Sequence, residues 1–314
     1  MSRRRNGKDI HGIVLLDKPA GYSSNQAVQA VKRLLGARKA GHTGSLDPFA
    51  TGMLPICLGE ASKTAGFMLE ASKVYLATAR MGQATTTGDI EGEVVREMPV
   101  PEWPAAGIET ALERFHGPIE QVPPMYSALK HEGRPLYKLA REGKEVPRQA
   151  RAVIIHSLEL IGWDRPLLTL KVECSKGTYI RTLAEDIAAA LGNCAHLQSL
   201  RRLSVGPFHD APMVSLDELE KRVATGSLEG CLLAPDAAIA DWPLVRLAAD
   251  QAERFAHGNS VNVAVDAEAA PPGLARVYGP GGPEARLLGL GEVRAEGRLH
   301  PKRLMLLTRD DRPV

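Results

Sequence analysis

The chain has 314 residues, of which 44% are hydrophobic, and its formal net charge is only +2. This length predicts two domains, or one large domain with a small one, in a soluble globular protein. No apolar run approaches the roughly 18 residues that indicate a membrane helix, and no apolar segment follows the basic start as in a secretory signal.

The four cysteines lie far apart in the sequence, at positions 57, 174, 194 and 231, and form no Cys-x-x-Cys pair. This spacing argues against structural zinc and against a disulfide framework, and it favours a reducing compartment. The chain also lacks a glycine-rich dinucleotide fingerprint and a phosphate loop. We therefore expect a cytoplasmic protein that needs no cofactor.

The small net charge hides an uneven distribution. Residues 1–60 hold nine basic and four acidic side chains, whereas residues 217–241 are acidic. A basic face on a nearly neutral protein suits a polyanion that binds on one side. A solvated surface with scattered charges is the alternative.

The first predicted elements are a buried strand at 13–16 and an amphipathic helix that ends at Leu35. Ser24 or Asn25 is the expected N-cap of this helix, and Gly36 the residue that ends it. The residues before the strand, 2–9, are predicted to form a tail.

The segment 41–52, GHTGSLDPFATG, is the most informative part of the chain. Three glycines and a proline in twelve residues fit neither an amphipathic helix nor a strand. It predicts a shaped loop that holds one carboxylate, Asp47, near one imidazole, His42. A turn in which Asp47 only bonds its own backbone is the alternative.

Further along, alternation predicts strands at 74–81, with Tyr75 on the buried face, and at 167–174. Helices are predicted at 105–116, closed by Gly117-Pro118, and at 182–191. A capping box at 215–218 opens another helix.

Residues 130–151 are polar and basic, and glycines and prolines interrupt a short helix around 137–141. This pattern predicts an insertion that stands off the core; we name residues 124–152 the insertion. It carries seven basic side chains, Lys130, Arg134, Lys138, Arg141, Lys144, Arg148 and Arg151. Phosphate binding is one interpretation of these charges, and a solvated loop is the other.

A domain boundary is predicted between residues 242 and 243. Beyond it, a helix at 248–257 and four short strands punctuated by Gly and Pro predict a small β-barrel. The strands are expected at 261–265, 275–278, 287–293 and 303–307, with a loop at 264–272.

Six segments resemble, in the same order, motifs of the TruB family of tRNA pseudouridine-55 synthases. They are GIVLLDKP (12–19), GHTGSLDPFATG (41–52), LPICLGE (54–60), VPPMYSALK (122–130), SKGTYIR (175–181) and HLQSLRRL (196–203). A single short motif has a real false-positive risk, whereas several ordered ones rarely arise by chance. The C-terminal part resembles a PUA-type RNA-binding module more weakly, through residues 289–291 and 298–304.

The resemblance implies an α/β (α+β) protein with the pseudouridine-synthase fold, a mixed and largely antiparallel sheet, and a C-terminal PUA-like module. The catalytic domain would span 1–242 and the module 243–314. The implied activity is isomerisation of uridine 55 in the T-loop of tRNA, with the T-arm held by the insertion. We expect a monomer that uses neither cofactor nor guide RNA.

The resemblance also implies the catalytic residues. Asp47 would be the carboxylate that attacks the base or the ribose, two alternatives that the sequence leaves open. Arg181 would pair with it and keep its pKa low, a role that lysine should fail to replace; phosphate binding or helix capping is the alternative for Arg181. Tyr75 would stack on the flipped base and assist proton removal from C5, although an ordinary strand tyrosine fits the same pattern.

The substrate-binding set implied by the resemblance is His42, Tyr179, Leu200, Lys18 and Lys130. His42 would stack in the RNA after the uridine flips out; a general-base role is the alternative, but nothing local to it in the sequence sets its tautomer. Tyr179 and Leu200 would line the uracil pocket, and both also fit a core. Lys18 is expected to support the loop.

The chain departs from the family pattern after the Tyr75 strand. The family often shows Thr-Asp-Thr-x-Asp, whereas Thr86 replaces the first aspartate here and Thr87 and Asp89 remain. We expect altered loop bonding there. Two rival functions stay open, a non-catalytic RNA-binding protein and a guide-RNA-dependent synthase.

Overall fold

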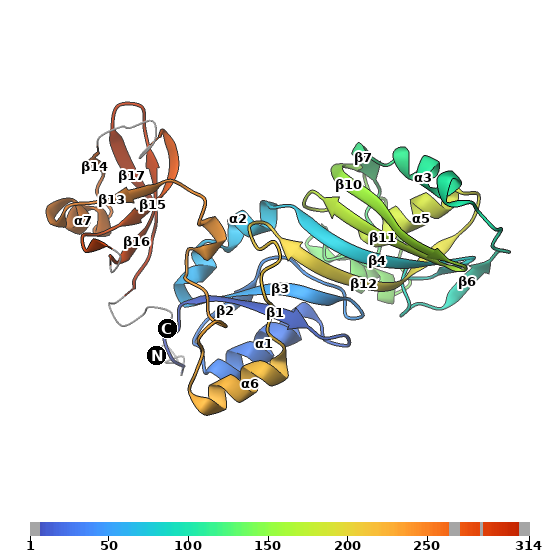
Figure 1. Ribbon diagram of the computed structural model, residues 1–314, viewed down its shortest axis with the longest axis horizontal. Coiled ribbons are helices and arrows are strands. Elements are labelled where there is room, and N and C mark those ends of the chain that lie inside the picture. Colours follow the sequence, from blue (N-terminus) through green and yellow to red (C-terminus); the bar gives the residue numbers. More distant parts are fainter. Residues whose placement is uncertain (1–6, 264–270, 283–284, 308–314) are drawn as a thin grey trace.

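The computed structural model describes residues 7–263, 271–282 and 285–307. Figure 1 shows a large sheet built from the blue-to-yellow part of the chain and a smaller, curled sheet built from its orange and red end. Residues 2–6 of the tail expected at 2–9, and most of the loop expected at 264–272, lie outside the described residues. Lys8 is described and pairs with residues 36–38 through backbone hydrogen bonds.

The large sheet has the order β1-β3-β12-β4-β11-β10-β7, with β2 paired to β3. Only the β3–β12 pair is parallel. This arrangement confirms the expected mixed, largely antiparallel sheet. Its strands are β1 (Gly12–Lys18), β2 (Ala40–His42), β3 (Thr51–Leu58), β4 (Lys73–Met81), β7 (Gly117–Gln121), β10 (Arg151–Asp164), β11 (Leu167–Cys174) and β12 (Ala195–Val205).

Helices cover both ends of this sheet. α1 packs with α6 beside β1 and β3, and α3 and α5 pack on β10, β12 and β4. α1, α3 and α5 bury apolar stripes, as Ala27, Val28 and Val31 do in α1. The helices are α1 (Ser24–Leu35), η1 (Gly59–Lys63), α2 (Ala65–Glu70), α3 (Ala105–Glu113), α5 (Ile180–Ala190), α6 (Leu216–Thr225) and η2 (Ala237–Ile239).

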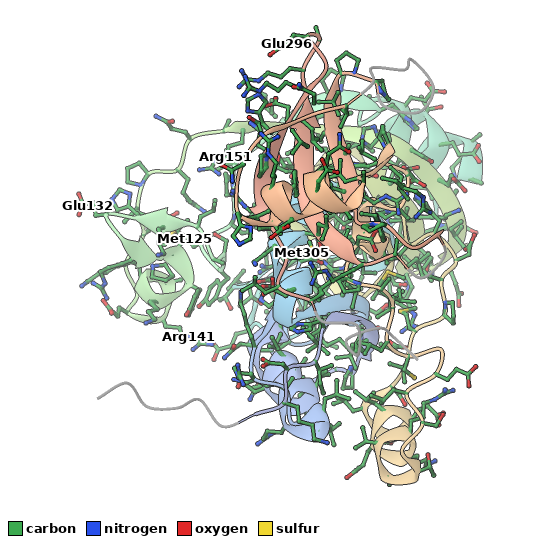
Figure 2. The ribbon with its side chains drawn as sticks, turned by 90° about the vertical axis from the view of Figure 1, so that its left-hand side faces the viewer. Met125, Glu132, Arg141, Arg151, Glu296 and Met305 are labelled. Atoms are coloured by element: carbon green, nitrogen blue, oxygen red, sulfur yellow. The ribbon has the colours of Figure 1, made fainter. Side chains whose placement is uncertain are left out.

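Two small hairpins leave the sheet. β5 (Gln83–Thr85) pairs with β6 (Val94–Glu97) after the Tyr75 strand. In the insertion, β8 (Lys130–His131) and β9 (Arg134–Pro135) precede α4 (Leu136–Arg141). Figure 2 shows this segment, with Glu132 and Arg141 labelled, standing away from the rest of the molecule as the sequence predicted.

The C-terminal part forms a five-stranded sheet in the order β13-β15-β16-β17-β14, with α7 (Ala249–Ala256) against it. Its strands are β13 (Leu244–Arg246), β14 (Val261–Asn262), β15 (Gly273–Tyr278), β16 (Leu287–Val293) and β17 (Arg298–Leu304). This confirms a small C-terminal β module. The domain limits themselves stay a prediction.

Hydrogen bonds join the parts of the chain that carry the two sheets. The Lys63 ammonium donates to the Leu304 carbonyl (2.6 Å), and the Leu306 N–H donates to the Glu60 carboxylate (2.7 Å). The Tyr278 hydroxyl donates to Asp236, which precedes η2 (2.6 Å). Among the described residues, no helix has the length and apolar character needed to cross a membrane.

Several expected boundaries were wrong. The N-cap of α1 is Ser23, one residue earlier than expected. Gly117 and Pro118 begin β7 instead of closing a helix, and the last strand is β17, not 303–307. Four long segments, β3, β7, β10 and β12, were not predicted as strands.

Gly52 allows β3 and β12 to approach each other. A Cβ atom at this position would lie 2.2 Å from the Arg202 carbonyl oxygen, and φ is +96°. We expect Gly52→Ala to lower the free energy of unfolding by more than about 1 kcal/mol, because alanine strains this φ and meets backbone. Urea unfolding measures the change.

Gly41→Ala is the matched control, because its Cβ would meet nothing within 4 Å and its φ is ordinary. Equal stability of the two variants would contradict the prediction.

Candidate active site

The loop between β2 and β3 is anchored to three other parts of the sheet domain. The Ser24 hydroxyl, from α1, accepts from the Leu46 N–H (2.8 Å) and donates to the Leu46 carbonyl (3.0 Å). The Lys18 ammonium donates to the Pro48 carbonyl (3.2 Å). Arg202 donates to the Gly44 carbonyl (3.1 Å). These bonds fix the backbone on both sides of Asp47.

Asp47 and Arg181 meet, as the sequence predicted. The Arg181 Nε lies 3.1 Å from one carboxylate oxygen, and Nη2 donates to the other (3.4 Å). Arg181 comes from the first turn of α5, which begins at Ile180, so the guanidinium is carried by a helix packed on the sheet.

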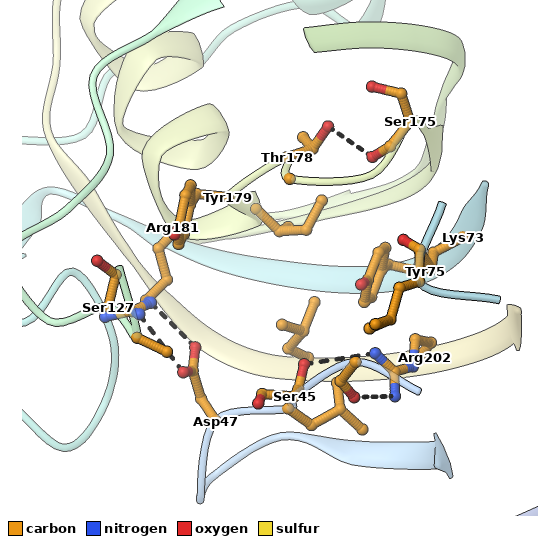
Figure 3. A pocket seen from close by; sticks show the side chains of 17 residues that line it. Ser45, Asp47, Lys73, Tyr75, Ser127, Ser175, Thr178, Tyr179, Arg181 and Arg202 are labelled. Atoms are coloured by element: carbon orange, nitrogen blue, oxygen red, sulfur yellow. Dashed lines mark hydrogen bonds and ion pairs between the residues drawn. The ribbon is translucent and has the colours of Figure 1, made fainter. Parts of the chain in front are cut away.

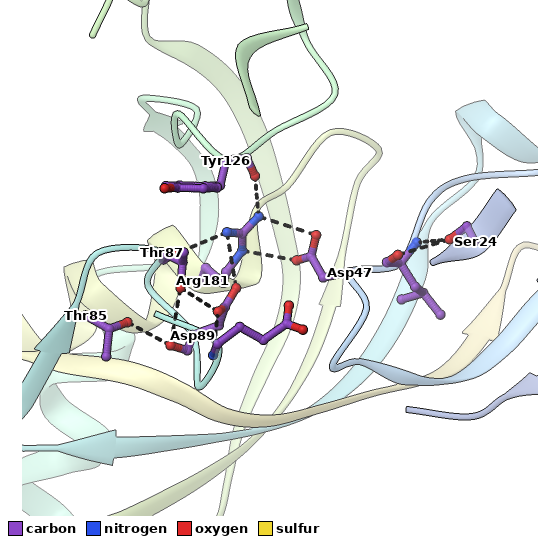
Figure 4. A network of polar contacts seen from close by, with 9 residues as sticks. Ser24, Asp47, Thr85, Thr87, Asp89, Tyr126 and Arg181 are labelled. Carbon is purple, nitrogen blue, oxygen red and sulfur yellow. Dashed lines mark hydrogen bonds and ion pairs between the residues drawn. The ribbon is translucent and has the colours of Figure 1, made fainter. Parts of the chain in front are cut away.

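The guanidinium has three further partners (Figure 4). Nη1 donates to the Thr87 carbonyl (2.8 Å) and lies 3.3 Å from Asp89, and Nη2 donates to the Tyr126 carbonyl (2.6 Å). Together with the two contacts to Asp47, these match the five N–H groups of an arginine. A buried guanidinium thus leaves no donor without an acceptor.

Burial raises the pKa of Asp47, whereas Arg181 is the largest influence lowering it. Arg181 therefore acts in the expected direction, but the expected low pKa was wrong because desolvation outweighs the ion pair. Still, 38% of the Asp47 side chain faces open space. A partly desolvated carboxylate that a fixed cation keeps in one orientation is suited to nucleophilic attack.

The turn after β5 supplies the second carboxylate. Asp89 accepts from the Thr87 hydroxyl (2.6 Å) and from the Glu91 N–H (3.1 Å) while it pairs with Arg181. Thr86 accepts from the Glu93 N–H (3.1 Å), across the base of the β5–β6 hairpin. Threonine at this position therefore bonds the hairpin backbone and leaves the Asp89–Arg181 pair intact.

A cavity of about 340 Å³ opens beside Asp47 (Figure 3). Tyr75, Tyr179, Arg181 and Leu200 line it together with Asp47, so five of the eight predicted residues meet there. Tyr75 is 8% and Leu200 7% exposed. Burial raises the pKa of the Tyr75 phenol, which is therefore neutral at pH 7.

His42, Lys18 and Lys130 do not line this cavity. Lys18 is fully buried beneath the loop and donates to the carbonyls of Pro19, Tyr22 and Pro48; burial lowers its pKa to about 8. Lys130 is exposed on the insertion. The contacts of Lys18 agree with the loop-supporting role expected of it, because it bonds the Pro48 carbonyl.

The His42 ring has a local partner that the sequence did not reveal. The Gly44 N–H donates to its Nδ1 (3.3 Å). This bond places the proton of the neutral ring on Nε2, so the expectation that nothing local sets the tautomer was wrong. Burial, and secondarily Arg202, lower the pKa of His42 and favour the neutral ring.

The insertion neutralises part of its own charge. Arg134 (2.5 Å) and Lys144 (3.0 Å) both pair with Glu142, and Arg148 pairs with Glu145 (3.0 Å). Four other basic side chains are exposed and form no ion pair with a described residue: Lys130, Lys138, Arg141 and Arg151. Arg141 lies over the Tyr137 ring.

Sequence reasoning missed three residues of this site, Asp89, Arg202 and Ser24. Asp89 had a signal, because it survives in the threonine-rich motif beside a lost aspartate. Arg202 lies in the motif at 196–203, but neither its contacts nor those of Ser24 could be predicted, because they involve backbone carbonyls and N–H groups that only the fold brings near. Across the described parts of the chain, His, Cys, Asp and Glu side chains form no group able to hold a metal ion.

We expect Arg181→Met to raise the pKa of Asp47 further, because it removes the largest influence that lowers it. NMR titration of the carboxyl carbon measures this shift.

Arg201→Met is the control, since Arg201 pairs with Asp17 instead (2.7 Å). An unchanged Asp47 titration in Arg181→Met would show that the ion pair has no influence on the carboxylate.

Comparison with known proteins covers most of the chain. Residues 32–180 match the family described as TruB family pseudouridylate synthase (N terminal domain), and residues 181–240 match tRNA pseudouridylate synthase B C-terminal domain. Residues 243–305 match Pseudouridine synthase II TruB, C-terminal.

Two curated relatives are similar over nearly their whole length. The tRNA pseudouridine synthase B of Nitrosococcus oceani is 51% identical, with 96% of this chain and 97% of that protein covered. The protein of the same name from Pseudomonas putida is 50% identical, with 96% and 98% covered.

Solved structures share the fold. A chain of the solved structure entitled "Crystal Structure of a Cbf5-Nop10-Gar1 Complex" aligns with a TM-score of 0.70 at 23% identity, over 96% of this chain and 86% of that one. At this identity the likeness concerns the fold alone. The extended similarity to the curated relatives, together with the three matches along the sequence, shows that this chain belongs to the TruB family of pseudouridylate synthases.

Proposed function

We propose that this enzyme converts uridine 55 in the T-loop of tRNA to pseudouridine, with Asp47 as the catalytic carboxylate. The observation that carries the proposal is the Asp47–Arg181 pair at the wall of a cavity that Tyr75 also lines. The names of the curated relatives support tRNA as the substrate.

The reaction breaks the C1′–N1 bond and rebuilds the link through C5. It involves no net redox change, so we propose that no cofactor takes part. A carboxylate must attack the base or the ribose, and a fixed cation must hold that carboxylate in place. Asp47 and Arg181 provide these two groups in one geometry.

The target uridine must leave its stack, because the cavity is a recess in the protein that accepts one base at a time. Tyr75 and Leu200 offer apolar surface to a base in the cavity, and Tyr179 borders it. We propose that the Tyr75 ring stacks on the uracil and that its oxygen accepts the C5 proton. His42, with its fixed tautomer, would fill the space that the uridine leaves in the RNA.

The insertion supports a stand-alone enzyme over a guide-dependent one. Its exposed basic side chains, Lys130 among them, contact phosphates of the T-arm. In a guide-dependent enzyme, the guide RNA would hold the substrate instead. We further propose that the enzyme acts as a cytoplasmic monomer. A binding protein without activity is the rival function, and the intact Asp47–Arg181 pair disfavours it.

The first test is a pseudouridine map of an unmodified tRNA transcript after incubation with wild-type protein or Asp47→Asn. We expect pseudouridine at position 55 with the wild type alone, because the amide cannot act as a nucleophile. Asp17→Asn is the control, since Asp17 pairs with Arg201 outside the cavity lining. Tight tRNA binding without product from the wild type would support the binding protein.

A second test concerns the insertion. We expect Lys138→Ala with Arg141→Ala to reduce the slope of log affinity for tRNA against log salt by about 2, because each lost phosphate contact removes roughly 0.9. Filter binding between low and moderate salt measures the slope.

Arg134→Ala with Lys144→Ala is the matched control, since it removes the same charge from side chains already paired with Glu142. Equal slopes for the two double variants would refute the proposal that Lys138 and Arg141 contact phosphates.

A further inference from the structure

Arg202 is a buried cation without an anion. Its side chain is among the largest that are fully buried, with the residue 1% exposed. Its guanidinium donates to three backbone carbonyls, those of Met53 (2.7 Å), Gly44 (3.1 Å) and Ser45 (3.4 Å). No carboxylate of a described residue forms an ion pair with it.

This arrangement is costly for a structural arginine. A buried charge is normally paired, because carbonyl dipoles replace only part of its hydration. Arg181, in the same cavity wall, has two carboxylates. An uncharged donor at position 202 would bond the loop carbonyls without this cost, so the positive charge itself requires an explanation.

Tyr75 is the neighbour of Arg202 on the next strand. The two residues are direct partners in the antiparallel β4–β12 pair, and both line the cavity (Figure 3). The groups that influence the phenol are Arg202 from β12, Cys174 from β11 and Asp47 from the loop. Of these, Arg202 alone favours the phenolate, through its positive charge.

Substrate phosphate is not a suitable anion for Arg202. The guanidinium is too deeply buried to meet a phosphate of the RNA backbone, and its bonds to Gly44 and Ser45 hold it under the loop. Tyr75, the direct strand partner of Arg202, carries a phenol that can become negative when it loses its proton.

We propose that Arg202 is a positioning residue that orients the Tyr75 oxygen and stabilises its negative charge during removal of the proton from C5. The inference rests on the proposed function and deepens it. The pair of Asp47 and Arg181 would then act in cleavage of the C1′–N1 bond. The pair of Tyr75 and Arg202 would act in the last proton transfer.

The proton balance is closed. The phenol first loses its proton to water, and Arg202 stabilises the phenolate. After the new C5–C1′ bond has formed, C5 carries both a hydrogen and the ribose. The C5–H bond then breaks, its electron pair forms the C5=C6 double bond, and the phenolate takes the proton. The electrons of the former N1=C6 bond move to N1, which takes a proton from water.

The test compares two variants that both lose the guanidinium fork, Arg202→Gln and Arg202→Lys. Each is assayed in single turnovers with tRNA that carries hydrogen or deuterium at C5 of the target uridine. We expect a rate loss of about 100-fold or more and a clear deuterium isotope effect in Arg202→Gln. Arg202→Lys retains the charge and should show a smaller loss and a smaller isotope effect.

Ser24→Ala is the control for loop anchoring, because it removes the bonds to Leu46 and leaves Tyr75 and Arg202 untouched. It should lower the rate without an isotope effect. Site-specific 3-fluorotyrosine at position 75, whose phenol is more acidic, should partly restore Arg202→Gln.

Thermal unfolding and tRNA binding first establish that each variant is folded. If Arg202→Gln is not folded, Arg202→Lys decides, measured alone and with 3-fluorotyrosine at position 75, which should then partly restore its rate. Equal rate losses in the Gln and Lys variants, or a loss without an isotope effect, would reduce Arg202 to a loop anchor. If the wild type forms no pseudouridine, the proposed function fails first and this inference fails with it.

Discussion

The guanidinium of Arg181 is the point on which the active site depends. Its five N–H groups find acceptors in three segments that are distant in the sequence, the loop with Asp47, the turn with Thr87 and Asp89, and the root of the insertion at Tyr126. Because an unsatisfied buried donor is costly, each of these segments is held in place by the same side chain. Loss of any one acceptor weakens the position of the others.

The two arginines of the cavity differ in their charge balance. Arg181 pairs with two carboxylates, whereas Arg202 donates to backbone carbonyl oxygens. One end of the cavity is therefore electrically compensated and the other keeps an excess of positive charge. Burial, and secondarily this positive charge, lower the pKa of His42. A reaction that moves negative charge across the base, from the glycosidic bond towards C5, suits such an uneven field.

Much of this arrangement followed from local sequence signals. Gly36 in the left-handed conformation ends α1 as predicted, and alternation placed Tyr75 on the buried face of β4. The ordered motifs predicted that Asp47 and Arg181 meet, although they are 134 positions apart in the sequence.

What the sequence did not reveal depends on tertiary contacts. β12 carries His, Gln, two Ser and two Arg among its apolar residues, and polar side chains such as Arg202 and Ser204 occupy buried positions, which hides its strand pattern. Arg202 lies in the motif at 196–203, but its burial and its bonds to three backbone carbonyls could not be predicted from that motif. The net pKa of Asp47 was also out of reach, since it depends on how much water the fold removes.

The bond between Arg181 and the Tyr126 carbonyl has a thermodynamic consequence. The same guanidinium contacts Asp47, the proposed nucleophile, and the root of the element proposed to grip the RNA. Linkage is reciprocal, so if RNA binding at the insertion alters the Arg181–Asp47 contact, the protonation of Asp47 must alter RNA affinity by the same factor. Affinity for tRNA then becomes a function of pH even for a substrate that cannot react.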